Sequence, residues 1–171
     1  MSSLKGALKL TAFFGLYFML LPFQALLYVS CRRSKIAFVI PWLYHTLSCK
    51  ILGLKVTCTG SPRKNAQVLF ASNHLSSFDI TVLGSVLFGA SFIAKSDIKD
   101  WAIYKTMAKL QQTVFIERAR SAARKETGSL SEALSGGRNL ILFPEGTSTD
   151  GQSVWPFKSS LFAALMLPEH Q

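Results

Sequence analysis

The sequence holds a first group of polar side chains suited to acid–base chemistry at Asn73-His74, followed by Ser76 and Asp79. An imidazole can take up a proton near neutral pH. A carboxylate bonded to its far nitrogen fixes the tautomer and stabilises the imidazolium that forms. His74 and Asp79 are therefore candidates for a general base and the carboxylate that orients it.

The spacing of this pair is weak evidence by itself. Residues five apart do not share a face of an ideal helix, where neighbours are three or four apart, although a turn leading into a helix lets them meet. An isolated pair of this kind is more often a partly buried histidine beside an aspartate that caps a helix. The other polar groups of the chain must decide between the two interpretations.

Two further groups carry chemistry for binding an anion. Pro144 and Gly146 predict a tight loop whose backbone N–H groups can point at an anion, and residues 147–149 add three hydroxyls. Glu145 would accept a hydrogen bond from a substrate hydroxyl or hold Arg118, whose guanidinium is a natural partner of phosphate. Taken singly, each group is equally consistent with an ordinary surface loop.

The polar groups each follow a predicted strand. In open α/β sheets, ligands bind beyond the carboxyl ends of the strands, so three such strands would deliver their polar residues to one shared edge. Strands and helices alternate, which predicts an α/β fold with a mixed, mostly parallel sheet flanked by helices. Strands are expected near residues 55–60, 67–72, 90–95, 113–118 and 139–143, and helices near 80–88, 96–112, 121–137 and from 159 onward.

The N-terminal region is apolar and helical in pattern. Leu10 to Cys31 carries no charge and as a helix would be about 33 Å long, enough to cross a hydrocarbon core of ~30 Å. Pro22 would kink or divide that helix. Ile36 to Leu54 suits an interfacial helix better than a span. Two geometries stay open: one span plus an interfacial helix, or a hairpin that dips into one leaflet.

Composition favours a membrane partner over nucleic acid. Of 171 residues, 49 % are hydrophobic and the net charge is +10, a combination that suits an anionic lipid surface. No basic stripe interleaved with aromatics is visible, so no nucleic-acid partner is expected. The three cysteines lack C-x-x-C spacing, which argues against a disulfide framework and a zinc site. Basic residues flank the apolar N-terminus and weakly predict that the bulk of the chain faces the cytoplasm.

The sequence therefore predicts two parts. Residues 1–54 form membrane-binding helices, and residues 55–171 form an α/β domain. The last predicted element reaches the final residue without a closing strand, so the C-terminal part of the domain is expected to be missing.

Taken together, the polar groups resemble the glycerolipid acyltransferase family related to 1-acyl-sn-glycerol-3-phosphate acyltransferase. The residues Asn73–Asp79, Val114–Arg118 and Phe143–Thr147 are similar to three sequence blocks of that family, in the same order. The stretches 92–101 and 156–160 are similar to regions between and after these blocks. The resemblance covers most of the chain from about residue 50.

This resemblance implies a reaction and a role for each matching residue. His74 would deprotonate an acceptor hydroxyl, with Asp79 orienting it, and the hydroxyl would attack the thioester of acyl-CoA or acyl carrier protein directly. The acceptor would be a lysophospholipid, typically 1-acylglycerol-3-phosphate, at the cytoplasmic face of a membrane. No metal or tightly bound cofactor is implied. The substrate-binding residues would be Asn73, Ser76, Lys95, Arg118, Glu145, Gly146 and Thr147.

The sequence departs from the family pattern in ways that keep alternatives open. Ser148 stands where many members have arginine, and the variant also resembles members that acylate lyso-ornithine lipid. The fourth block of the family is absent. A serine esterase would need a G-x-S-x-G motif, which does not occur here. A non-catalytic membrane adaptor is a further alternative. Acyl-chain length, the identity of the donor and the oligomeric state are not determined by the sequence.

Overall fold

The computed structural model describes residues 3–61, 66–95, 102–116, 133, 136–159 and 162. They fall into two units, each described here by itself. The helical unit comprises Met1–Pro62 and Ser77–Gly89, and the sheet unit comprises Arg63–Ser76 and Ala90–Gln171.

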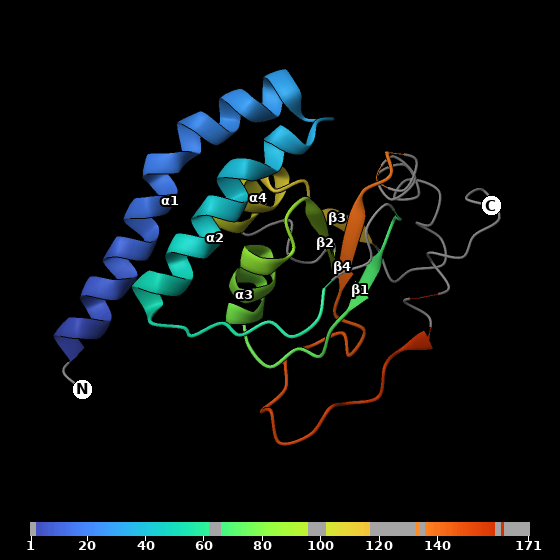
Figure 1. Cartoon of the computed structure of the whole chain (residues 1–171). Helices are drawn as coiled ribbons and strands as arrows, with labels where there is room; N and C mark the ends of the chain where they lie inside the picture. The colour runs from blue at the N-terminus through green and yellow to red at the C-terminus, as the bar shows by residue number, and fades with distance from the viewer. Residues whose placement is uncertain are drawn as a thin grey trace. The chain divides into compact units, whose positions relative to one another are not determined.

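The helical unit is built around a hairpin of two helices. Helix α1 covers Ser3–Cys31, a short 3₁₀ helix η1 covers Lys35–Phe38, and α2 covers Val39–Leu52. Helices α1 and α2 run side by side, and α3, Phe78–Val86, lies against α2 (Figure 1). The predicted helices are confirmed. Pro22 does not divide α1, which continues through it as one helix that bends in its second half.

Side chains tie the hairpin together near both of its ends. The Lys9 ammonium donates to the carbonyl of Leu52 at 2.7 Å, where α2 ends. The Gln24 amide donates to the carbonyl of Ala37 at 3.0 Å, in a buried position close to the turn. Each bond satisfies a carbonyl at a helix end, where no partner within the helix is available.

Helix α2 ends at a glycine cap, and the chain after it forms no strand. Gly53 has a φ of 77°, its N–H donates to the last turn of the helix, and the N–H of Leu54 donates to Cys49 O at 2.8 Å. This is a Schellman ending. The predicted strand at 55–60 is wrong: these residues pair with no described strand and are mostly exposed. Alternating polarity favours a strand, but a strand also needs a neighbouring strand to pair with, which this pattern does not reveal.

Helix α1 is long and apolar enough to cross a membrane, judged by length and composition alone. It is the one such helix in the searched part of the chain. Only 22 % of its most apolar stretch is buried in the protein. A helix that forms the core of a soluble protein is mostly buried, so this exposure is consistent with an apolar face that contacts lipid.

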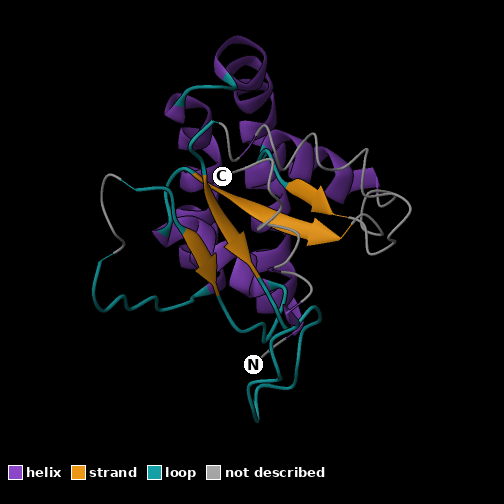
Figure 2. Ribbon diagram, turned by 90° about the vertical axis from the view of Figure 1, so that its right-hand side faces the viewer, coloured by secondary structure: helices purple, strands orange, loops and turns teal. Residues whose placement is uncertain are grey.

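The described residues of the sheet unit form four parallel strands. They are β1 (Leu69–Ala71), β2 (Ala90–Lys95), β3 (Val114–Ile116) and β4 (Asn139–Leu142). Their order in the sheet is β1-β4-β2-β3, and every pairing is parallel, as the arrows in Figure 2 show. The predicted α/β fold is confirmed. The last of the described strands, β4, lies between β1 and β2, so β1 and β4 present their carboxyl ends side by side.

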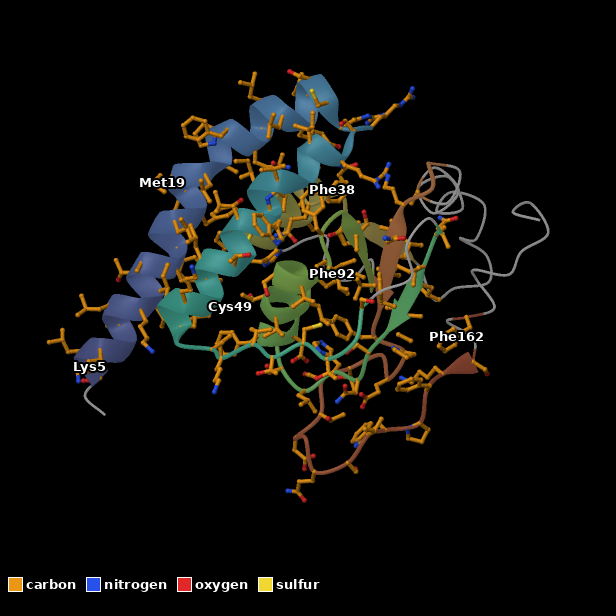
Figure 3. All side chains as sticks on the ribbon, viewed as in Figure 1. Lys5, Met19, Phe38, Cys49, Phe92 and Phe162 are labelled. Atoms are coloured by element: carbon orange, nitrogen blue, oxygen red, sulfur yellow. The ribbon has the colours of Figure 1, made fainter. Side chains whose placement is uncertain are left out.

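The core of the sheet unit lies around β4, whose last three residues are buried. Helix α4, Ala102–Leu110, connects β2 to β3 and confirms part of the helix predicted over 96–112. The helices predicted over 121–137 and from 159 onward fall almost entirely outside the described residues. A cluster of buried apolar side chains, with Phe162 (labelled in Figure 3) packed against it, comprises Ile93, Val114, Ala133, Leu140 and Leu142.

Candidate active site

The candidate site begins where β1 and β4 end, because the chain continues from both strands into two adjacent loops. The N–H of Ser72 donates to Leu142 O at 3.0 Å, which extends the parallel ladder one residue beyond β1. After this bond, one loop carries residues 73–76 and the other carries residues 143–158. The strand order therefore brings two segments about 70 residues apart in sequence to the same edge of the sheet.

Glu145 joins these loops through its carboxylate. The side chain is 1 % exposed. One carboxylate oxygen accepts from the backbone N–H of His74 at 2.7 Å, and the other accepts from the backbone N–H of Trp155 at 3.0 Å. Hydrogen bonds to an ionised acceptor are stronger than neutral ones, so this carboxylate fixes both backbones in place.

His74 is held at its backbone and against its ring. Its carbonyl accepts from the N–H of Thr149 at 2.8 Å and from the hydroxyl of the same residue at 3.3 Å. Its imidazole stacks on Phe143, with ring centroids 4.1 Å apart and planes 18° apart. Phe143 is in turn stacked at 6.3 Å on Phe92, which belongs to β2. The imidazole thus has a defined position at the edge of the sheet.

The turn at Gly146 uses backbone N–H groups that were expected to point at an anion. Gly146 has a φ of 76°, which favours glycine, and its N–H donates to Phe143 O at 3.0 Å. The N–H of Thr149 is bonded to His74, as described above. These two N–H groups stabilise the loops themselves, so any anion cradle here must use other donors.

The remaining predicted residues of these loops lie close in sequence to the groups just described. Asn73 and Ser76 are half-buried, on the same loop as His74, and the carbonyl of Asn73 accepts from the hydroxyl of Ser72 at 3.0 Å. Thr147 is exposed. The structure therefore gathers Asn73, His74 and Ser76 with the loop after β4, as predicted from the topology.

Three other predicted residues lie outside these two loops. Asp79 lies in the first turn of α3, in the helical unit, and its pairing with His74 stays a prediction. Lys95 is the last residue of β2, and its side chain lies outside the described part. Arg118 lies outside the described residues. It follows β3, which is separated from β4 by β2.

The position of Glu145 bears on the role that was expected for it. A direct contact between this carboxylate and the substrate stays a prediction. Both of its oxygens accept from backbone N–H groups and the side chain is buried, an arrangement that favours a positioning role. No sequence pattern predicted the contacts of Phe143 and Thr149 with His74, or of Trp155 with Glu145, because these contacts are a ring stack and hydrogen bonds to backbone groups.

The described residues offer no evident metal site. Among them, no group of three or more His, Cys, Asp or Glu side chains is arranged to hold a metal ion. The prediction that the protein uses no tightly bound cofactor stays a prediction. What the described site offers is an imidazole in a fixed position beside several hydroxyl groups, which is an arrangement suited to moving a proton.

Comparisons with known proteins identify a sequence family and a shared fold. The sequence model of the Acyltransferase family matches residues 55–168. A lyso-ornithine lipid O-acyltransferase of Brucella abortus is 37 % identical over 158 residues, which cover 92 % of this chain and 58 % of that protein. A 1-acyl-sn-glycerol-3-phosphate acyltransferase of Neisseria gonorrhoeae is 35 % identical over 134 residues, 78 % of this chain and 52 % of that protein.

A solved structure shares the fold. The 1-acyl-sn-glycerophosphate acyltransferase PlsC of Thermotoga maritima superposes with a TM-score of 0.71 at 22 % identity, covering 96 % of this chain and 70 % of that one. The α/β architecture is therefore shown twice, by the strand pairing and by this likeness. The chain spans about half the length of the relatives that it matches in sequence.

Proposed function

The chain belongs to the Acyltransferase family, and from this premise we propose that it transfers a fatty acyl group from acyl-CoA or acyl carrier protein to the free hydroxyl of a lysolipid. The observation that carries the proposal is the placement of His74. Its backbone is bonded at both its N–H and its carbonyl, and its ring is stacked on Phe143. A base held in this way loses little entropy when the reaction begins.

The proposed reaction needs one base and no covalent enzyme intermediate. The imidazole of His74 takes the proton of the acceptor hydroxyl as its oxygen attacks the thioester carbonyl. A tetrahedral intermediate forms and collapses, the carbon–sulfur bond breaks, and the thiolate leaves and takes up the proton. A thiol with a pKa near ~8.5 is a good leaving group, so no strong acid is required. Asp79 would hold the imidazole in the productive tautomer.

Two acceptors are candidates, and the loop after β4 favours one of them. The relatives include proteins named for lyso-ornithine lipid and proteins named for 1-acyl-sn-glycerol-3-phosphate. Residues 147–151 contain no cation, and their one charged side chain is the exposed carboxylate of Asp150. A phosphate headgroup calls for cations, whereas the ammonium of an ornithine headgroup does not. We therefore favour a lyso-ornithine-type acceptor, with 1-acylglycerol-3-phosphate second.

Membrane attachment through the N-terminal hairpin completes the proposal. Lysolipid acceptors reside in bilayers, and α1 is apolar and largely exposed. Lys5 and Lys9 precede the uncharged stretch, while Arg32 and Arg33 follow it, as expected of an apolar helix bordered by headgroups. The domain that carries His74 is proposed to face the cytoplasm.

A reconstituted assay tests the proposal directly. The purified chain in mixed micelles receives either lysolipid with labelled acyl-CoA or acyl carrier protein, and the acylated product is measured. We expect the substitution His74→Ala to lower the rate by about 10²–10⁴-fold, the usual contribution of a general base. Thermal unfolding of the variant should stay close to that of the parent. Acyl transfer within a few-fold of the parent would contradict the assignment of His74.

A further inference from the structure

The two loops at the candidate site carry an unusual concentration of exposed apolar side chains. Leu75 is 45 % exposed, Val154 62 %, Trp155 49 % and Phe157 44 %. In the described part of the sheet unit, the one other exposed large apolar side chain is Leu69, at 36 %. Clustered exposed apolar groups mark a surface that contacts a membrane, a ligand or another protein.

Hydrogen bonds fix the backbones that carry these side chains. The N–H groups of His74 and Trp155 donate to the same carboxylate, that of Glu145, so the two loops lie side by side. The N–H of Lys158 donates to Pro144 O at 2.9 Å and fixes the far end of the second loop. This loop extends away from the carboxyl edge of the sheet (Figures 1 and 2). Its backbone is therefore fixed even though its side chains are exposed.

The chemistry of this surface matches the interfacial zone of a bilayer. Tryptophan and phenylalanine partition to the level of the lipid headgroups, and a neighbouring cation is attracted to anionic lipids. Lys158 is exposed and follows Phe157 directly, and the whole chain has a net charge of +10. An anionic leaflet attracts such a cation next to inserted apolar side chains.

We infer that Leu75, Val154, Trp155 and Phe157 form a second membrane-contact surface, separate from the N-terminal hairpin, that inserts into the interfacial zone of an anionic bilayer. The inference deepens the proposed function, on which it partly rests. The proposed base, His74, is the neighbour of Leu75 in the chain, so insertion of this surface would set the base at the level where lysolipid hydroxyls lie. The acceptor would then reach the base without leaving the bilayer.

Fluorescence of a single tryptophan tests the insertion without any catalysis. In the full chain with Trp42→Phe and Trp101→Phe, Trp155 is the remaining tryptophan. Mixed with vesicles of phosphatidylcholine and phosphatidylglycerol, its emission should shift to shorter wavelength, and lipids brominated on the acyl chain should quench it. A matched control moves the reporter: with Trp155→Phe added, Leu69→Trp should show neither change.

Three outcomes overturn the inference. Emission typical of an indole in water, without quenching by brominated lipid, means that the surface does not insert. Equal quenching of the reporter at position 69 means that the signal is not specific to this surface. Quenching by a spin-labelled acyl-CoA but not by brominated lipid means that the loop binds the acyl donor instead of the bilayer.

Kinetics separate this inference from the proposed function. The pair Val154→Ser and Phe157→Ser should raise KM for an acceptor presented in vesicles by about tenfold, since each large apolar group contributes up to about one order of magnitude in partitioning. Activity on a short-chain, water-soluble acceptor should stay unchanged, and Val154→Leu with Phe157→Leu should restore KM. An unchanged KM in the serine pair contradicts insertion. Quenching of Trp155 in a protein without acyl transfer would leave the inference standing and defeat the proposed function.

Discussion

At the scale of single residues, the candidate site depends on a carboxylate that makes its contacts with backbone groups. Glu145 accepts hydrogen bonds from the N–H groups of His74 and Trp155 and is 1 % exposed. We propose that Glu145 affects the reaction by positioning His74. The distinction is testable, because a positioning residue changes both stability and rate, whereas a residue that contacts substrate changes chiefly KM and kcat.

Replacement of Glu145 by alanine should leave two backbone donors without their acceptor. Each donor left unsatisfied costs about 1–3 kcal/mol, so the free energy of unfolding should fall by about 2–6 kcal/mol. The rate of acyl transfer should fall with it, because the backbone of His74 is released. Chemical denaturation and the acyl-transfer assay measure the two effects. Thr149→Val is the matched control, since it removes the longer hydroxyl bond to His74 and keeps the N–H bond at 2.8 Å. A stable Glu145→Ala variant with an unchanged rate would contradict the positioning role.

The acceptor preference should respond to a charge placed at Ser148. This exposed residue stands in the loop 147–151, which contains no cation. Ser148→Arg should raise kcat/KM for 1-acylglycerol-3-phosphate relative to lyso-ornithine lipid by about tenfold or more, because a charge-assisted bond to phosphate is worth about 1.5–3 kcal/mol. Competition between the two lysolipids in one assay measures this ratio. Ser148→Gln, of similar length but neutral, should leave it unchanged. If the arginine variant had the same ratio as the parent, this position would not contact the headgroup.

At the scale of elements, close packing of helices α2 and α3 is set by one glycine. A Cβ built on Gly84 would overlap the ring of His45, lying 2.7 Å from its Cγ and 2.8 Å from its Nε2. His45 is buried at the centre of α2, so the ring has little room to move. The absence of a side chain at Gly84 therefore allows the two helices to pack this closely.

Gly84→Ala should destabilise the helical unit by about 1–3 kcal/mol, the usual cost of overpacking. Thermal unfolding followed by circular dichroism measures it. The control is Gly15→Ala in α1, where a Cβ would meet nothing within 4 Å. That change should be neutral or slightly stabilising, since alanine is the better helix former. The double variant Gly84→Ala/His45→Ala should lose less stability than the sum of the two single changes. Strict additivity would mean that the overlap with His45 is not the cause.

The sequence predicted most of these elements because their patterns are local. Three of the confirmed strands are short apolar runs. A polar loop after β4 was expected because residues 144–151 contain proline and glycine. The strand expected at 55–60 was wrong because pairing depends on a neighbour that alternation cannot reveal. The position of β4 between β1 and β2, and the bond from Glu145 to His74, join residues about 70 apart. No local sequence pattern predicts such contacts. The resemblance of three sequence blocks to the family did, however, identify His74 and Glu145 as site residues.

At the scale of the whole molecule, the helical unit constrains how the chain sits on a bilayer. Helix α1 packs on α2, and α2 packs on α3, whose first turn carries Asp79. The unit also buries polar side chains, including Gln24 and His45. If α1 crossed the hydrocarbon core, it would draw α2 and α3 into the bilayer, together with Asp79. A charged group at the bilayer centre is costly. We therefore expect the hairpin to lie in one leaflet.

Labelling of the native cysteines distinguishes the two geometries. Cys31 ends α1, at the tip of the hairpin, and exposed Cys58 follows α2, whereas Cys49 is buried. In sealed vesicles with the protein added from outside, a membrane-impermeant maleimide should modify both Cys31 and Cys58 if the hairpin lies in the outer leaflet. A spanning α1 would protect Cys31 until the vesicles are opened with detergent. Cys31→Ser and Cys58→Ser variants identify which residue reacts, by mass spectrometry.

The place of β4 in the sheet also bears on how the protein is made. Leu69 pairs with Leu140, and Phe92 on the other side pairs with Ile141, so β1 and β2 are both synthesised before the strand that pairs between them. Until residue 142 emerges, β1 and β2 expose inner edges that can recruit other nascent chains. Because Ser72 and His74 take their bonds from this late segment, the proposed base is assembled only after synthesis has passed it by roughly 70 residues. Nascent-chain length should thus govern when the chain becomes resistant to aggregation and when the proposed site forms, and the two events should coincide.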